Sequence, residues 1–248
     1  MSVRLALARA GVPAGIVQAE APRAEKAMVE HAITTQARAR DFLAQVLHES
    51  AGLRYFEEIA SGAAYEGRAD LGNTHPGDGR RYKGRGPIQL TGRANYRWAG
   101  HLLGLPLEQN PALAAQHDVG WRIAALYWKS HGLNELADQG QFVTITRRIN
   151  GGTNGLAARV HYRQLVGGVD CRPQPPDPLR FLTDTERRWC REYDRLKHEG
   201  RDEPRRRALR AAMTRARKGV HAAATREPNG WHRHHRLERY RELKRRSS

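Results

Sequence analysis

A cluster of prolines divides the chain into two parts. The segment Cys171-Arg-Pro-Gln-Pro-Pro-Asp-Pro178 places four prolines in eight residues. Proline is excluded from the interior of helices and sheets because it lacks a backbone N–H and its ring clashes with the preceding turn. Such a segment favours an extended linker. We therefore predict a first domain over residues 1–170, a linker over 171–179 and a second region over 180–248.

Charge is distributed unequally between these parts. The formal net charge is +17, and residues 171–248 hold 23 Lys+Arg against 11 Asp+Glu, a net of +12, which leaves +5 for the first 170 residues. A strongly basic surface attracts polyanions, and nucleic acid, anionic lipid and bacterial wall polymers all qualify. Charge alone does not choose among these partners.

Apolar residues recur at helical spacing in the first part. Residues 36–50 place five side chains at i, i+3, i+4, i+7 and i+8, namely Ala39, Phe42, Leu43, Val46 and Leu47. Thr34 or Thr35 is suited to cap the start of this helix. Comparable patterns predict helices over residues 95–103, 118–130 and 142–149. The fold class that follows is mainly α.

The second part is also predicted to be helical. Thr183-Asp-Thr-Glu186 has the pattern of a capping box, which opens a helix with Trp189, Tyr193 and Leu196 on one side. A second helix starts at Pro204 and carries Leu209, Met213 and Val220. A third follows Gly230-Trp231 with Leu237, Tyr240 and Leu243. All three combine a narrow apolar stripe with a very basic surface.

Several classes of protein are disfavoured. The mean hydropathy is −0.75 and no apolar run reaches about 18 residues, so no membrane span is predicted. Arg9 and Pro13 interrupt the apolar stretch that a signal peptide would need. Cys171 and Cys190 are interpreted as two reduced thiols, with a single bridge as the alternative. The histidines show no metal-ligand spacing, and neither a metal nor a cofactor is expected.

Glu49 is the first candidate for chemistry. It follows Phe42 by seven residues, which places it within about 20° of Phe42 on the helical wheel. Burial of an unpaired carboxylate is costly, and the C-terminal end of a helix disfavours negative charge. Both effects favour the protonated carboxyl, which can act as a general acid. The alternative is a frayed last turn that exposes Glu49 to water.

Glycosidic cleavage would require a second carboxylate. An inverting enzyme separates its acid and base by roughly 6.5–9.5 Å to admit a water, and a retaining enzyme by about 5 Å. Glu57, Glu58 and Glu66 follow the helix of Glu49, near a long Gly-rich stretch over residues 60–88. A loop of that length inside a compact domain is usually functional. Spacing alone does not choose among the three.

Three segments resemble the signature blocks of glycoside hydrolase family 19, which contains plant and bacterial chitinases and many phage endolysins. They are His48-Glu-Ser-Ala-Gly52, Tyr82-Lys-Gly-Arg-Gly-Pro-Ile-Gln-Leu-Thr-Gly92 and Ile149-Asn-Gly-Gly152. The resemblance covers roughly residues 25–167. Residues 53–68 are similar to the phage and prophage branch, and Ala51 departs from the glycine usual at its position. The resemblance implies a mainly α-helical, two-lobed, lysozyme-like domain with a substrate groove, followed by a basic helical tail.

The resemblance also assigns roles to residues. It makes Glu49 the general acid and Glu58 the general base, because the family's base is followed seven residues later by a tyrosine, here Tyr65. Thr91 matches the hydroxyl that helps to hold the catalytic water. The residues that match sugar-binding or carboxylate-orienting positions are Gln89, Asn95, Tyr96, Asn150 and Arg159. Candidates for stacking on sugar rings are Tyr55, Tyr65, Tyr82 and Trp98.

The function implied is that of an endolysin, a monomer that hydrolyses the glycan strands of peptidoglycan by acid/base, inverting catalysis. We expect synthesis in the cytoplasm without a signal peptide and action in the periplasm or cell wall after holin-assisted release. The alternatives are a chitinase and a non-catalytic protein that binds wall or nucleic acid. The basic tail is expected to bind the anionic envelope. No motif for specific nucleic-acid binding accompanies it, and a third interpretation is that its charge serves solubility alone.

Overall fold

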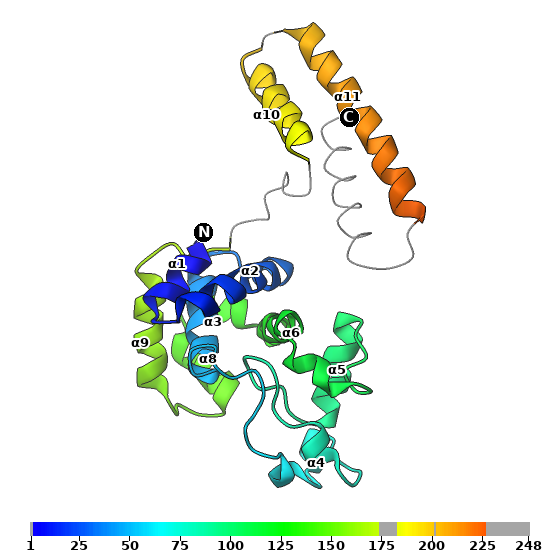
Figure 1. The fold of residues 1–248 in the computed structure, drawn as a ribbon. Helices are drawn as coiled ribbons and strands as arrows, with labels where there is room; N and C mark the ends of the chain where they lie inside the picture. The colour runs from blue at the N-terminus through cyan, green and yellow to red at the C-terminus, as the bar shows by residue number, and fades with distance from the viewer. Residues whose placement is uncertain (1, 174–182, 201, 227–248) are drawn as a thin grey trace. The chain divides into compact units, whose positions relative to one another are not determined.

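The computed structural model describes residues 2–173, 183–200 and 202–226 and divides the chain into two compact units, Met1–Gln174 and Pro175–Ser248 (Figure 1). Helices and turns make up both units, and no strand occurs among the described residues. The prediction of a mainly α fold is therefore confirmed. Within the described part of the chain, no helix is long and apolar enough to cross a membrane.

The predicted helices of the first unit are present, with ends within two residues of those expected. The α-helices are α1 Ser2–Arg9, α2 Ala14–Glu30, α3 Gln36–Glu49, α4 Asp78–Arg81, α5 Arg93–Leu103, α6 His117–Ser130, α7 Leu133–Asp138, α8 Phe142–Asn150 and α9 Leu156–Gly167. Three short 3-10 helices are η1 Ala63–Tyr65, η2 Ala69–Leu71 and η3 Pro111–Ala115. Helices α1, α2, α4, α7 and α9 were not predicted from the apolar pattern.

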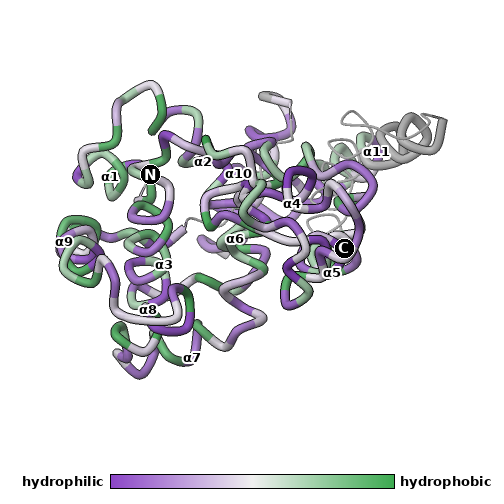
Figure 2. Tube along the Cα trace, turned by 90° about the horizontal axis from the view of Figure 1, so that it is seen from below, coloured by the Kyte–Doolittle hydropathy of each residue, from purple (hydrophilic) through white to green (hydrophobic). Residues whose placement is uncertain are grey.

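Two hydrophobic cores divide the first unit into two lobes. Lobe A is built from α1, α2, α3, α7, α8 and α9, and lobe B from residues 57–116 with α4 and α5 (Figure 1). Helix α6 belongs to both, because Trp121 and Trp128 lie in the core of lobe A while Ile123 and Leu126 lie in that of lobe B. Figure 2 shows apolar and hydrophilic residues interspersed along the helices, as helices that bury one face require.

Helix α3 lies in the core of lobe A and carries the first candidate residue at its end. Its start is capped by Thr35, whose hydroxyl accepts a hydrogen bond from the Arg38 N–H at 3.2 Å. Helix α3 ends at Glu49, and the next turn is left-handed, with φ of 50° at Ala51, 73° at Gly52 and 65° at Leu53. This turn directs the chain from lobe A into lobe B.

The Gly-rich stretch of lobe B is a loop held by hydrogen bonds to the exposed Glu66 and by an ion pair of the buried Asp78. Both carboxylate oxygens of Glu66 accept backbone hydrogen bonds, from Gly77 at 2.6 Å and from Gly79 at 2.8 Å. Asp78 is buried and pairs with Arg93 at 2.6 Å, and this guanidinium lowers the pKa of Asp78 to about 2. The loop is therefore held by two separate sets of contacts, those of Glu66 and those of Asp78.

The second unit contains a pair of helices, α10 Asp184–His198 and α11 Glu203–Arg226. The predicted capping box is present, since Thr183 accepts from the Glu186 N–H and Glu186 accepts from the Thr183 N–H. The two helices share a small core of Cys190, Tyr193, Leu196, Leu209 and Met213. The helix predicted after Gly230 lies outside the described residues.

Both cysteines are buried thiols, each in a different unit. Cys171 was predicted to begin the linker, but it belongs to the core of lobe A and its N–H donates to the Gln36 side chain at 3.0 Å. Burial raises the pKa of the Cys171 thiol to about 12. Cys190 lies against the sulfur of Met213.

Candidate active site

A cavity of about 460 Å³, here called the central cavity, is lined by residues of both lobes. Its lining consists of Leu71, Ile88, Gln89, Leu90, Thr91, Asn95, Trp98, Tyr127, Ser130, His131 and Ile149. Four residues predicted from the sequence therefore line the same cavity, namely Gln89, Thr91, Asn95 and the stacking candidate Trp98. The volume and the mixture of apolar and amide groups suit a small-molecule or sugar ligand.

The turn that carries Gln89 is fixed by local hydrogen bonds. Gln89 adopts a left-handed φ of 56°, and its side-chain amide donates to the carbonyl of Gly86 at 3.0 Å. The Thr91 hydroxyl donates to the Gln89 carbonyl at 2.8 Å, and Asn95 donates to the Thr91 carbonyl at 2.8 Å. A non-glycine residue in this conformation is strained, and such strain is often found at functional sites.

Glu49 is paired with a buried arginine. Its side chain is 24% exposed and accepts a hydrogen bond at 2.5 Å from Arg159, whose side chain is 2% exposed. Arg159 also donates to Gln45 at 2.5 Å, and Gln45 donates to the hydroxyl of Thr146 at 2.8 Å. The expectation of an unpaired carboxylate on the apolar face is therefore wrong, because a guanidinium reaches it from α9. The frayed last turn considered as the alternative is not observed either, since α3 is intact to Glu49.

Glu49 is outside the lining of the central cavity but interacts with one residue of it. Burial raises the pKa of the Tyr127 phenol, and the charge of the Glu49 carboxylate raises it further. Tyr127 is a lining residue, so this electrostatic interaction relates the acid candidate to the cavity. His48 precedes Glu49 in the sequence. Burial and the positive charge of Arg159 lower the pKa of His48, which favours a neutral imidazole near Glu49.

Glu58 is held from three directions. Its carboxylate accepts hydrogen bonds from the Tyr65 hydroxyl at 3.1 Å and from the Gly84 N–H at 3.0 Å. Its own N–H donates to the Gly84 carbonyl at 2.9 Å. A Cβ at Gly84 would lie 2.6 Å from the Gln89 amide oxygen and 3.2 Å from the Glu58 carboxylate. Glu58 and the cavity residue Gln89 thus flank the same glycine.

The other two glutamates left open by spacing have structural partners instead. Glu57 pairs with Arg85 at 3.1 Å and with Lys83 at 3.3 Å. Glu66 accepts the backbone hydrogen bonds of Gly77 and Gly79 within the loop of lobe B. Glu57 is connected to the cavity wall through Arg85, whose backbone exchanges hydrogen bonds with the lining residue Leu90, whereas Glu58 lies beside Gly84 next to Gln89. The assignment of Glu58 as the general base stays a prediction.

Several predicted ligand contacts need correction. Tyr96 is fully buried, and its hydroxyl donates to the Lys83 carbonyl at 2.7 Å, so it has no surface to offer a sugar. Tyr82 is buried in the same core and donates to the Glu108 carbonyl. Arg159 is enclosed and acts on Glu49. Asn150 is outside the cavity lining, and its amide donates to the Asn154 carbonyl at 3.0 Å.

Other site residues were not predicted. His131 stacks on Tyr127 with ring centroids 3.8 Å apart, and both line the cavity with Ser130 at the end of α6. No motif surrounds these positions, so no sequence signal identified them. Gln45 did carry a signal, because it is a polar residue four positions before Glu49 on the helix of an otherwise apolar core. Among the described residues, no group of three or more potential His, Cys, Asp or Glu metal ligands occurs.

Comparison with known proteins places the site within a matched region. Residues 34–136, which include Glu49, Glu58 and the Gln89–Asn95 wall, match the family model described as class I chitinase. A glycosyl hydrolase family 19 domain-containing protein of Haemophilus influenzae is 38% identical over 110 residues, which are 44% of this chain and 53% of that protein. An endochitinase of Arabidopsis thaliana is 41% identical over 125 residues, 49% of this chain and 42% of its own.

The chain thus spans about half the length of these curated relatives. Among solved structures, a mutant of chitinase C is 26% identical with a TM-score of 0.54, over 69% of this chain and 79% of that one. This likeness agrees with the two-lobed helical architecture of the first unit.

Proposed function

Because the chain belongs to glycoside hydrolase family 19, we propose that it hydrolyses the glycan strands of bacterial peptidoglycan as an endolysin. The observation that carries the proposal is the pairing of two carboxylates with one cavity. Glu49 interacts electrostatically with the lining residue Tyr127, and Glu58 lies beside Gly84, next to the lining residue Gln89. Each is held by its own hydrogen bonds, from Arg159 and from Tyr65 respectively.

The proposed reaction is acid/base hydrolysis with inversion. Glu49 gives its proton to the glycosidic oxygen as the bond from that oxygen to the anomeric carbon breaks. A water near Thr91 attacks the anomeric carbon from the opposite face and passes its proton to Glu58. Arg159 then faces the carboxylate that Glu49 has become, and a guanidinium at hydrogen-bond distance stabilises that charge.

Peptidoglycan as the substrate is supported by the sequence that follows Glu49 and contains Glu58. Residues 53–68 resemble the phage and prophage branch of the family, and they form the turn after α3 and the start of the lobe B loop. A chitinase is the second candidate, because the Arabidopsis relative is named an endochitinase and the similar solved structure a chitinase. Both candidates use the same two carboxylates and differ in the polymer that fills the cavity.

The remaining expectations accompany this proposal. The enzyme would be made in the cytoplasm, released with the help of a holin, and act on the wall as a monomer. Its basic second region would hold it at the anionic envelope. The support for this last point is the net charge of +12 on residues 171–248.

The test is mass spectrometry of the products released from purified peptidoglycan and from chitin. Wild type is expected to release muropeptides with a new reducing end, and Glu49→Gln to lower the rate by orders of magnitude. Glu57→Gln is the matched control, because that carboxylate pairs with Arg85 rather than with the cavity. Cleavage of chitin alone would select the chitinase, and cleavage of neither polymer would refute hydrolase activity.

A further inference from the structure

The apolar face of α10 is already occupied. Tyr193 and Leu196 are buried against Leu209 and Met213 of α11, and Trp189 packs partly against the same cluster. A basic amphipathic helix at a membrane normally buries its apolar face among the lipids. In this pair of helices that face is used for folding, so insertion would require the two helices to separate.

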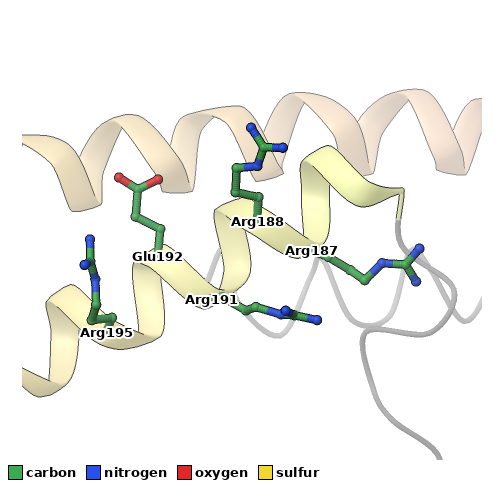
Figure 3. A pocket seen from close by; sticks show the side chains of 5 residues that line it. All are labelled: Arg187, Arg188, Arg191, Glu192 and Arg195. Carbon is green, nitrogen blue, oxygen red and sulfur yellow. The ribbon is translucent and has the colours of Figure 1, made fainter.

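The opposite face of α10 is rich in arginine. Figure 3 shows Arg187, Arg188, Arg191, Glu192 and Arg195, which together line a hollow of about 480 Å³. At 100° per residue these positions fall within an arc of about 140°, and the buried apolar positions lie on the other side of the helix. Arg188, Arg191 and Arg195 are exposed. Their Cα atoms span about 10 Å along the helix axis, at 1.5 Å per residue.

The acidic member of this face is already paired. Glu192 accepts a hydrogen bond from Arg205 of α11 at 2.8 Å, which also lowers the pKa of Glu192. The negative charge of Glu192 is compensated by Arg205 of α11. The net charge of the arginine-rich face of α10 is therefore positive. Guanidinium groups bind phosphate with two parallel hydrogen bonds, and they do so in a preorganised planar geometry.

We propose that the arginine face of α10, formed by Arg188, Arg191 and Arg195 with Arg187, binds the phosphate groups of an anionic lipid surface by charge and hydrogen bonding, without insertion of the helix. That the lipid surface is the bacterial envelope rests on the proposed function. The binding itself depends only on the second unit. Nucleic acid is the less favoured phosphate source, because Tyr193 lies in the core of the pair and Trp189 packs against that core, away from the arginine face, so neither ring offers a platform for bases.

The test is co-sedimentation of the full chain with vesicles of phosphatidylglycerol and phosphatidylcholine, and with vesicles of phosphatidylcholine alone. Wild type should bind the anionic vesicles and be released by concentrated sodium chloride. The triple variant R188Q/R191Q/R195Q should bind about 100-fold more weakly, at about fivefold for each arginine removed. The vesicles contain no glycan, so the result is independent of whether the chain hydrolyses peptidoglycan.

A charge-matched variant separates a defined face from net charge. R4Q/R80Q/R147Q removes three exposed arginines of the first unit and should bind almost as wild type does. The lysine variant R188K/R191K/R195K, with helicity checked by circular dichroism, should keep most of the binding. Equal loss in both glutamine variants would overturn the proposal. So would binding that survives concentrated salt, or tighter binding to duplex DNA than to the anionic vesicles.

Discussion

Arg159 on α9 reaches across lobe A to hydrogen-bond Glu49 at the end of α3, and the same guanidinium holds Gln45 one turn earlier on that helix. One buried cation thus fixes two side chains of α3 at i and i+4. Because Gln45 also donates to Thr146 on α8, three helices determine where the Glu49 carboxylate lies. The acid candidate is therefore positioned by the packing of lobe A and not by the loop that follows it.

Arg159→Lys should impair the chemical step more than substrate binding. A lysine ammonium cannot make both hydrogen bonds of the guanidinium fork, so the Glu49 carboxylate loses its fixed geometry. We expect kcat to fall about 100-fold with little change in KM, since a misplaced catalytic group costs about that much. Steady-state kinetics on soluble glycan fragments would measure this. A raised KM at unchanged kcat would instead make Arg159 a substrate ligand.

Gln45→Leu tests the next hydrogen bond in the series that connects Glu49, Arg159, Gln45 and Thr146. The substitution keeps the side-chain volume and leaves Arg159 with Glu49 and the Asn154 carbonyl, so we expect a kcat about tenfold below wild type. Thr146→Val removes the hydroxyl that accepts the hydrogen bond of Gln45, which is the contact of this series farthest from Glu49, and it should have a smaller effect on kcat. Thermal unfolding of each variant separates this effect from lost stability. Wild-type kcat in Gln45→Leu would show that Arg159 is positioned without its help.

Gly84→Ala should reduce activity while leaving the fold intact. The new methyl group would meet the Gln89 amide oxygen at 2.6 Å and the Glu58 carboxylate at 3.2 Å, which are ends of side chains that can move. We expect both to be displaced and kcat to fall about 100-fold, with a change in unfolding free energy below about 1 kcal/mol. Gly67→Ala is a control for mutation in this loop, because no neighbour lies within 4 Å of its Cβ, although its φ of 69° predicts some strain.

Ala51→Gly should stabilise the protein. Ala51 has a φ of 50°, and an L-residue pays about 1–2 kcal/mol for the left-handed conformation. Glycine removes this cost but loses more backbone entropy on folding, about 0.5–1 kcal/mol. The net expectation is a gain of about 0.5–1 kcal/mol in urea unfolding. Ala44→Gly, within α3, should lose at least about 1 kcal/mol by helix propensity, and a loss at both sites would contradict the argument.

Tyr96 makes stability sensitive to alkaline pH. Burial raises the pKa of its phenol to about 12, against about 10 in an unfolded chain. A folded pKa above the unfolded value means that the contribution to stability is complete below about pH 10 and is lost as the pH rises through about 12. The expected loss is about 2–3 kcal/mol over this window. In Tyr96→Phe the difference from wild type should shrink across the same window, and a constant difference would count against this assignment.

The helices that sequence predicted well are those with one continuous apolar stripe. Helix α3, with Phe42 and Leu43 on its buried face, and the capping box of Thr183 were both found because they depend on local spacing. Helix α1 was missed because Ser2–Arg9 has few residues from which to read a period, and its stability comes from packing on α2 and α9. Local pattern does not report contacts that only the folded chain creates.

The site shows the same limit. Glu49 was found on its helix, but the helical pattern left its carboxylate unpaired, because Arg159 is 110 residues away in sequence. Only the family resemblance marked Arg159 as a residue that orients a carboxylate. Tyr96 was predicted to bind substrate because of its position in the motif. Its ring instead packs in the apolar core of lobe B, and its hydroxyl donates a hydrogen bond to the Lys83 carbonyl. His131 entered the cavity with no motif at all. Spacing identifies candidate side chains, and tertiary packing decides which of them face a ligand.

The two candidate carboxylates are anchored to different kinds of structure. Glu49 is fixed by α3, α8 and α9, whereas Glu58 is fixed to Gly84 and Tyr65 within the loop of lobe B. Insertions or deletions in that loop would alter the separation of the carboxylates without disturbing the helices around Glu49. Changes in the length of this one surface loop would therefore alter the distance between acid and base, and with it the width of polymer accepted, while the helices around Glu49 stay unchanged.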